Sequence, residues 1–429
     1  MKSRRPCNAA AELERVFPDR IRVSVFGIAI FTLAIIGHMW TVWAKDVWWL
    51  IDTEVYRAGA ERVTASLPLY DHSVYDGLQF TYSPFAALCF VPLTLFSMDS
   101  LRFLVTCVNL AAPLVVVWMA WGFLGYRPNH GRLAMTFLVG GFALWLEPVR
   151  TTVVLGQVNL LLLILIMMDC APRGSHRARG VGVGIAAAIK LTPCIFVVYF
   201  VVTRRFKAAL VSVLTILATI MIGFFVIPGD SAKYWGGLFL DSSRIGAVTN
   251  VGNQSIAGLL SRQMHVLNPP TLLWMALSGL TVVIALTFAA LAHRCGEELL
   301  AISIVGISSC LASPLSWSHH WVWVILLLVI GVHHVQGHRR WAALSVAAFV
   351  MLFFSWIVGK SKLPDRTPPM GIIQRTSQAE WSMLVCNNLY VWIAVIVYAA
   401  TFWYLSRIAA KDFQPDPPVG DRNGECLAQ

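Results

Sequence analysis

Long apolar runs separated by short polar stretches dominate the chain. The first run covers residues 23–44, and the last covers residues 385–404. A helix needs about 20 apolar residues to cross a bilayer, and many of these runs approach that length. The pattern predicts an all-α polytopic membrane protein, with roughly twelve membrane segments in a single domain at residues 23–407.

The composition and the charge distribution support this prediction. Hydrophobic residues make up 57% of the 429 residues and charged residues only 13%, whereas soluble domains carry about 25% charged residues. The net charge of +11 comes from Arg and Lys in short loops and tails, which is typical of cytoplasmic loops and indicates topology rather than nucleic-acid binding. We therefore expect a multi-pass plasma-membrane protein with cytoplasmic tails at residues 1–22 and 408–429, the second one disordered.

Two stretches do not fit a simple crossing. The apolar stretch at residues 83–97 is short and contains two prolines. If this stretch is interfacial or half-inserted, the basic loops that follow fall on the cytoplasmic side, as the positive-inside rule requires. The first outer loop then covers residues 45–102. Residues 181–202 lie between two basic loops, so we expect two half-depth helices with a turn at residues 190–193, where Pro193 disfavours helix in the residue before it. A single tilted helix with a paired lysine is the alternative.

Five polar islands interrupt the apolar pattern, and this topology brings all of them to the extracytoplasmic side. They are residues 52–62, residues 147–159, Lys190, residues 250–255 and residues 313–320. Apolar walls with a few convergent polar groups are typical of a membrane-embedded active site.

Short motifs within these islands follow a fixed order along the chain. They are DTEVYRAGA at 52–60, PLY at 68–70, TYSP at 81–84, GQVN at 156–159, AIKLTP at 188–193, NQS at 253–255 and SPLSWSHH at 313–320. The ordered series resembles the GT-C membrane glycosyltransferases, and more closely glycosyltransferase family 87, the actinobacterial mannosyltransferases. Ser83 departs mildly from the family, in which proline is common at this position.

The resemblance implies a GT-C-type fold with an extracytoplasmic active-site cavity and no cofactor. It also implies a lipid-linked sugar donor and a glycolipid acceptor drawn from the membrane lipids. Within the family the series is most similar to inverting enzymes that add α-(1→2)-mannose from polyprenyl-phosphate mannose to phosphatidylinositol mannosides during cell-envelope biosynthesis.

Two alternatives remain open at this point. One is mannosyl or arabinosyl transfer to lipomannan or lipoarabinomannan within the same family. The other is a lipid-linked-sugar transporter. Many transporters contain internal repeats, and the sequence shows no such repeat. This absence and the carboxylate-rich first outer loop both favour the enzyme.

Family members place a catalytic aspartate just after the first helix, which here is Asp52. A polyprenyl phosphate leaves readily, so one carboxylate acting as general base suffices. Glu54 is the other candidate, as a base or as a substrate contact, and it shares a face with Asp52 only in an extended strand. Either carboxylate could instead pair with Arg57 or Arg62.

The leaving phosphate needs positive charge or hydrogen-bond donors. Lys190, His319 and His320 are the candidates for this role. The histidine pair could also be structural or bind a metal, but no HExxH motif or nearby carboxylate accompanies it, so we expect no metal.

Amide and aromatic side chains, together with Arg57, are the candidates for substrate contacts. They are Tyr56, Arg57, Gln157, Asn159, Asn253, Gln254 and Trp317. The amides could equally cap helices, and aromatic residues are common at membrane interfaces whatever their function.

Overall fold

The computed structural model describes residues 15–17, 21–43, 50–172, 178–335 and 384–412. Helices make up the regular secondary structure of these ranges, in agreement with the predicted all-α class. The expected tails at residues 1–22 and 408–429 lie largely outside the described residues.

Four helical segments of the described ranges are long and apolar enough to cross a membrane. They are α4 (Met98–Phe123), α10 (Phe206–Val226), α13 (Thr271–Arg294) and Cys386–Ile408, which includes most of α18 (Leu389–Asp412). Helices α5 (His130–Trp145) and α6 (Glu147–Leu155) meet at an angle of 78° and could together form a fifth span. The chain is therefore a membrane protein, and the larger predicted number of segments stays a prediction.

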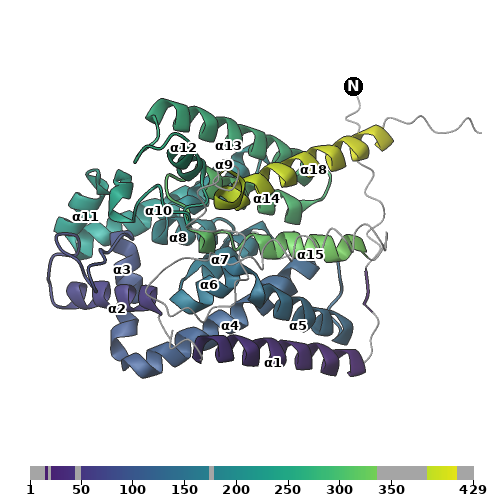
Figure 1. The fold of residues 1–429 in the computed structure, drawn as a ribbon, viewed down its shortest axis with the longest axis horizontal. Helices are drawn as coiled ribbons and strands as arrows, with labels where there is room; N and C mark the ends of the chain where they lie inside the picture. The colour runs from purple at the N-terminus through teal and green to yellow at the C-terminus, as the bar shows by residue number, and fades with distance from the viewer. Residues whose placement is uncertain (1–14, 18–20, 44–49, 173–177, 336–383, 413–429) are drawn as a thin grey trace, which may run out of the picture.

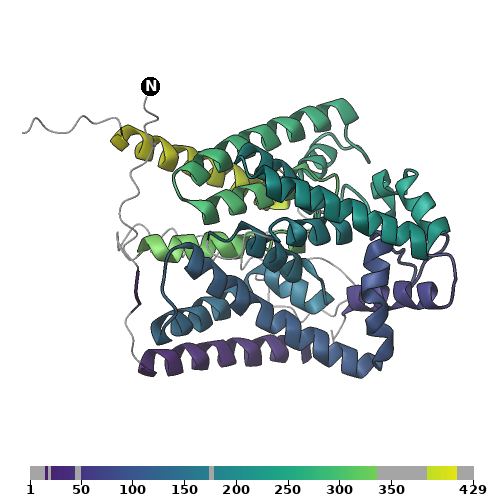
Figure 2. The same cartoon turned by 180° about the vertical axis from the view of Figure 1, so that it is seen from behind.

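The remaining helices pack between and around these segments (Figures 1 and 2). They are α1 (Ile21–Trp43), α2 (Ile51–Thr64), α3 (Pro84–Phe90), α7 (Asn159–Cys170), α8 (Val181–Ile189), α9 (Ile195–Val202), α11 (Pro228–Trp235), α12 (Ile256–Gln263), α14 (Glu298–Ala312) and α15 (Val324–Val335). Helices α2, α3 and α11 gather at one end of the bundle, on the left in Figure 1, far from the C-terminal end of α18. The first polar island therefore lies at one end of the molecule.

Both stretches that the sequence marked as irregular are broken in the structure. Residues 83–97 form α3 and a short 3-10 helix, η1 (Val91–Leu95), and Ser83 caps α3 by accepting a hydrogen bond from the amide of Ala86. Helix α8 ends at Ile189, Lys190 is extended, and the chain continues through η2 (Thr192–Cys194) into α9. The predicted break at residues 190–193 is confirmed.

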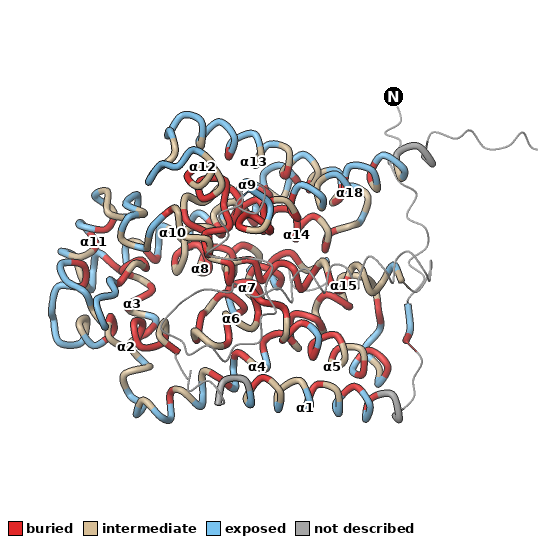
Figure 3. Tube along the Cα trace, viewed as in Figure 1, coloured by how far each residue is buried: buried red, intermediate tan, exposed pale blue. Residues whose placement is uncertain are grey.

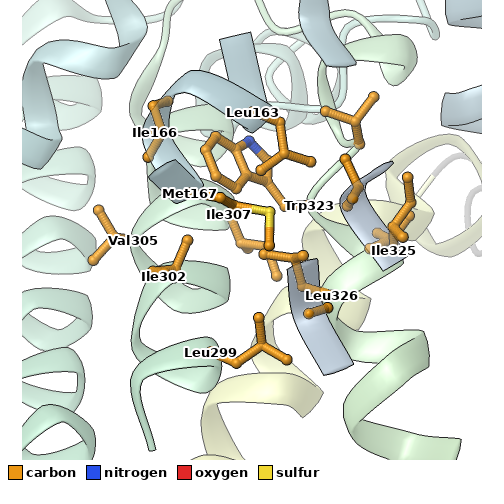
Figure 4. Close-up of a cluster of buried hydrophobic side chains, with 14 of the residues drawn as sticks. Leu163, Ile166, Met167, Leu299, Ile302, Val305, Ile307, Trp323, Ile325 and Leu326 are labelled. Atoms are coloured by element: carbon orange, nitrogen blue, oxygen red, sulfur yellow. The ribbon is translucent and has the colours of Figure 1, made fainter. Parts of the chain in front are cut away.

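The hydrophobic core lies at the centre of the helical bundle (Figure 3). Figure 4 shows the part where α7, α14 and α15 meet, and its labelled residues are Leu163, Ile166, Met167, Leu299, Ile302, Val305, Ile307, Trp323, Ile325 and Leu326. Trp323 stacks on Phe196 with ring centroids 5.3 Å apart. A Cβ at Gly306 would lie only 2.0 Å from the Trp323 ring, so glycine permits this close approach. The packing fixes the segment that immediately follows η5 (Ser318–His320).

Candidate active site

Asp52 lies in the first turn of α2, so the segment is helical rather than extended. Side chains two positions apart on a helix point in different directions. Glu54 pairs with Arg102, with 2.9 Å between Oε1 and the guanidinium, and its side chain is 11% exposed. Asp52 keeps partial solvent exposure. The helix therefore separates the two carboxylates that the sequence offered as candidate bases.

The carboxyl group of Asp52 is tuned by three neighbouring effects. Burial raises its pKa to about 6, while a hydrogen bond from Gln157 and the positive charge of Lys190 act in the opposite direction. Burial disfavours the charged form of a carboxylate, and donors or cations favour it. A carboxylate with a pKa near 6 is ionised at neutral pH and is still basic enough to accept a proton.

Two buried tyrosines set the orientation of the Gln157 amide. The hydroxyls of Tyr56 and Tyr82 donate to Gln157 Oε1 at 2.9 and 3.1 Å and lie 2.8 Å from each other. With its oxygen occupied, the amide presents its NH₂ group to Asp52. Tyr56 is only 2% exposed and stacks on Phe90, so its ring has no free face for a sugar.

Helix α2 meets the C-terminal end of α6 in a close backbone junction. The Leu50 amide donates to the Val154 carbonyl at 3.0 Å, and Thr53 Oγ1 donates to the Gly156 carbonyl at 3.1 Å. Gly156 has a φ of +70°, and a Cβ there would lie 2.1 Å from Thr53 Oγ1. Glycine is required at this position both for its backbone conformation and for the available space.

Lys190 is linked to Asp52 by the interaction of their charges and to the histidine turn through Asn159. Its Nζ donates to Asn159 Oδ1 at 3.1 Å, and Asn159 Nδ2 donates to the His319 carbonyl at 3.0 Å. Lys190, Asn159 and His320 line a small cavity of about 30 Å³ together with apolar residues of α7 and of the segment after η5. The structure therefore brings four of the predicted site residues together, namely Asn159, Lys190, His319 and His320.

The two histidines are neutral at physiological pH. Burial and the nearby Lys190 charge lower the pKa of His319 to about 3 and that of His320 well below its usual value. The rings meet edge to face at 4.7 Å, and Nε2 of His319 has no hydrogen-bond partner within the described ranges. They can offer hydrogen bonds, but Lys190 is the cation. In the part of the chain that the structure describes, no group of three or more His, Cys, Asp or Glu residues could hold a metal.

The amides of Asn253 and Gln254 are engaged within the protein. Asn253 donates to the Val248 carbonyl at 3.0 Å and accepts from the Ser316 amide at 2.9 Å. Gln254 donates to the Asn387 carbonyl at 2.9 Å. Both residues are fully buried, so their hydrogen bonds hold neighbouring loops together.

Two further candidates lie outside the Asp52–Lys190 cluster. Trp317 packs against Gly246 and Gly252, where added Cβ atoms would lie 2.8 and 3.1 Å from its ring. Arg57 pairs with Glu61 at 3.0 Å and is one turn further along α2 than Asp52. Neither of them contacts the carboxylate or the lysine by any described interaction.

Glu147 begins the second polar island but was not among the predicted site residues. It is 3% exposed and is surrounded by hydroxyl donors. The signal available in the sequence was a carboxylate between two apolar runs, which is costly in a membrane protein and often functional.

Comparison with known proteins identifies a shared family. Residues 80–314 match the model of glycosyltransferase family 87. Two similar proteins, from Mycobacterium tuberculosis H37Rv and Mycolicibacterium smegmatis, are both named polyprenol-phosphate-mannose-dependent alpha-(1-2)-phosphatidylinositol mannoside mannosyltransferase. The first is 33% identical over 81% of this chain and 84% of its own length, and the second is 30% identical over 85% and 87%.

A third relative, from M. tuberculosis CDC 1551, carries a name that specifies a pentamannoside. It is 32% identical over 74% of this chain and 75% of its own length. No solved structure is significantly similar to the chain.

Proposed function

Because the chain belongs to glycosyltransferase family 87, we propose that it transfers mannose from polyprenyl-phosphate mannose to a phosphatidylinositol mannoside. The product is an α-(1→2) linkage formed with inversion. The names of the relatives support the donor, the acceptor and the linkage. The chain also covers most of the length of these relatives, so no large part of their sequence lacks a counterpart here.

Asp52 acts as the general base in the proposed reaction. It takes the proton from the acceptor hydroxyl as that oxygen attacks C1 of the donor mannose, and the bond between C1 and the phosphate oxygen breaks. The observation that carries this assignment is the carboxyl group of Asp52, a partly exposed residue, whose pKa is near 6 and on which the charge of Lys190 acts. Such a pKa suits a base that works near neutral pH.

Lys190 stabilises the negative charge that develops on the leaving phosphate, and the neutral histidines contribute hydrogen bonds. Fixed donors and charges of this kind favour a transition state because they need no reorganisation during the reaction. A retaining route needs a second carboxylate close to the first. The pairing of Glu54 with Arg102 supports the inverting route.

The proposed enzyme is a GT-C-type protein of the plasma membrane with about twelve membrane segments. Its active site opens on the extracytoplasmic face, and residues 23–407 form one catalytic domain. The distribution of Arg and Lys among the loops supports this orientation. The grouping of α2, α3 and α11 at one end of the bundle agrees with it (Figure 1).

The decisive experiment is transfer by the purified protein in lipid nanodiscs. Polyprenyl-phosphate mannose is supplied with phosphatidylinositol mannosides of increasing length, and the product linkage is determined. We expect an added α-(1→2)-mannose with wild type and none with Asp52→Asn, while Glu54→Gln retains transfer. Failure of the wild type to transfer mannose to any of these acceptors, or full activity of Asp52→Asn, would contradict the proposal.

A further inference from the structure

The buried carboxylate of Glu147 takes no part in the proposed chemistry. Its Oε1 accepts hydrogen bonds from Ser318 at 2.7 Å and Thr151 at 2.9 Å, and its Oε2 accepts from Tyr390 at 2.6 Å. A carboxylate this deeply buried costs stability unless it is well hydrogen-bonded, and an apolar residue of similar volume is often more stable. These three hydrogen bonds offset the cost of burial, and the residues that donate them show what the carboxylate holds in place.

Two of the three donors to Glu147 come from distant parts of the chain. Thr151 lies on α6 itself, Ser318 on η5 and Tyr390 on α18. Ser318 is the first residue of the turn that carries His319 and His320. The carboxylate therefore anchors the start of the histidine turn to α6.

Helix α6 also holds the histidine turn at a second point and supports the base at its other end. Thr152 Oγ1 donates to the His319 carbonyl at 3.1 Å, the same carbonyl that accepts from Asn159. Just after the C-terminal end of α6, Gly156 contacts α2 and Gln157 hydrogen-bonds Asp52. Nine residues of helix, about 13 Å long, thus connect the two halves of the site.

We propose that Glu147 is a positioning residue that sets the histidine turn, and through Asn159 the lysine, relative to Asp52. It acts through Ser318 and touches no substrate. The inference rests on the proposed function, because that function assigns the histidine turn to the leaving phosphate of the donor. A displacement of about 1 Å in such a group can cost up to about a hundredfold in rate.

The test is a double-mutant cycle with Glu147→Gln and Ser318→Ala in the full-length enzyme. We expect each single change to raise the KM for polyprenyl-phosphate mannose on the order of tenfold. The double variant should be no worse than the less active single variant, since Ser318→Ala removes the hydrogen bond that Glu147→Gln weakens by replacing the carboxylate with a neutral amide. The KM for the acceptor and the acidic limb of the pH profile, which Asp52 sets, should stay as in wild type.

Thr151→Val is the matched control. It removes another hydroxyl from the same carboxylate oxygen without touching the histidine turn, so the donor KM should match that of wild type. Independent, additive effects of the two cycle variants would overturn the inference. It also fails if Thr151→Val raises the donor KM as much as Ser318→Ala does, or if the variants lower only thermal stability.

Failure of the proposed function gives a different result. A wild-type enzyme that transfers no mannose to any of the acceptors refutes that function before the variants are compared. The double-mutant cycle can then be repeated with the thermal unfolding temperature of the detergent-solubilised protein as the measured quantity in place of the donor KM. Coupling between Glu147→Gln and Ser318→Ala would support the anchoring bond, and its absence would refute the anchoring as well.

Discussion

Replacing Gln157 with leucine should move the pH dependence of catalysis toward higher pH. The Gln157 amide donates to the ionised Asp52 carboxylate and helps to hold its pKa down to about 6. Loss of a hydrogen bond to the charged form favours the protonated form, so the pKa rises. The base is active only when deprotonated, and therefore the acidic limb of kcat/KM must shift upward.

The size of the shift follows from the energy of the lost bond. A hydrogen bond to a charged group contributes about 1.5–3 kcal/mol, and 1.36 kcal/mol corresponds to one pKa unit. Asp52 is partly exposed, so water replaces some of the lost interaction and we expect a shift of about one unit. At pH 6 the deprotonated fraction would fall from roughly one half to roughly one tenth, whereas at pH 8 it would change by less than about 10%.

The assay is mannose transfer measured from pH 5 to pH 9 at subsaturating donor. Tyr82→Phe is a graded variant, because Tyr56 still donates to the Gln157 oxygen, and its shift should be smaller than that of Gln157→Leu. An acidic limb that stays in place in Gln157→Leu, or that moves to lower pH, would show that this amide does not tune the base.

Three other substitutions test separate parts of the site. Lys190→Met should raise the donor KM by about tenfold to a hundredfold, the equivalent of one charge-assisted hydrogen bond, and an unchanged donor KM would remove Lys190 from the phosphate site. Gly156→Ala should lower thermal stability and activity more than Gly125→Ala. Both residues have a positive φ, but only at Gly156 would the new Cβ clash, with Thr53 Oγ1, so equal losses would argue against the junction. Asp52→Asn should lower kcat by about 10²–10⁴-fold yet unfold at the wild-type temperature or above it at pH 7. The folded-state pKa of Asp52 lies above its unfolded value, so ionisation costs stability as pH rises from about 4 to about 6, and a lower unfolding temperature would contradict this sign.

The sequence predicted the features of this site that depend on local pattern. The charge bias of the loops and Pro193 together located the break at Lys190, because both are properties of neighbouring residues. The order of the short motifs identified the family, which the comparisons confirm. The choice of Asp52 came from the resemblance, because family members place an aspartate just after the first helix, and its role as the base stays a prediction.

The pairing of distant groups could not be predicted in the same way. Whether Glu54 shares a face with Asp52 depends on the conformation of α2, and its partner Arg102 lies 48 residues away. Amides such as Asn253 look alike in sequence whether they bind a sugar or fasten a loop. The role of Glu147 depends on Ser318 and Tyr390, which no local periodicity connects to it.

The hydroxyl of Ser83 stabilises the break in the apolar segment at which the charged residue Lys190 lies. Where α8 stops, its last carbonyls lose the partners that a further turn would supply, and hydrocarbon offers no replacement. The Ser83 hydroxyl donates to one of them, the carbonyl of Ala188. A proline at this position has no hydroxyl to donate, so that oxygen would need another partner. Ser83→Pro should therefore alter the rigidity of this joint before it alters any group that meets the sugar.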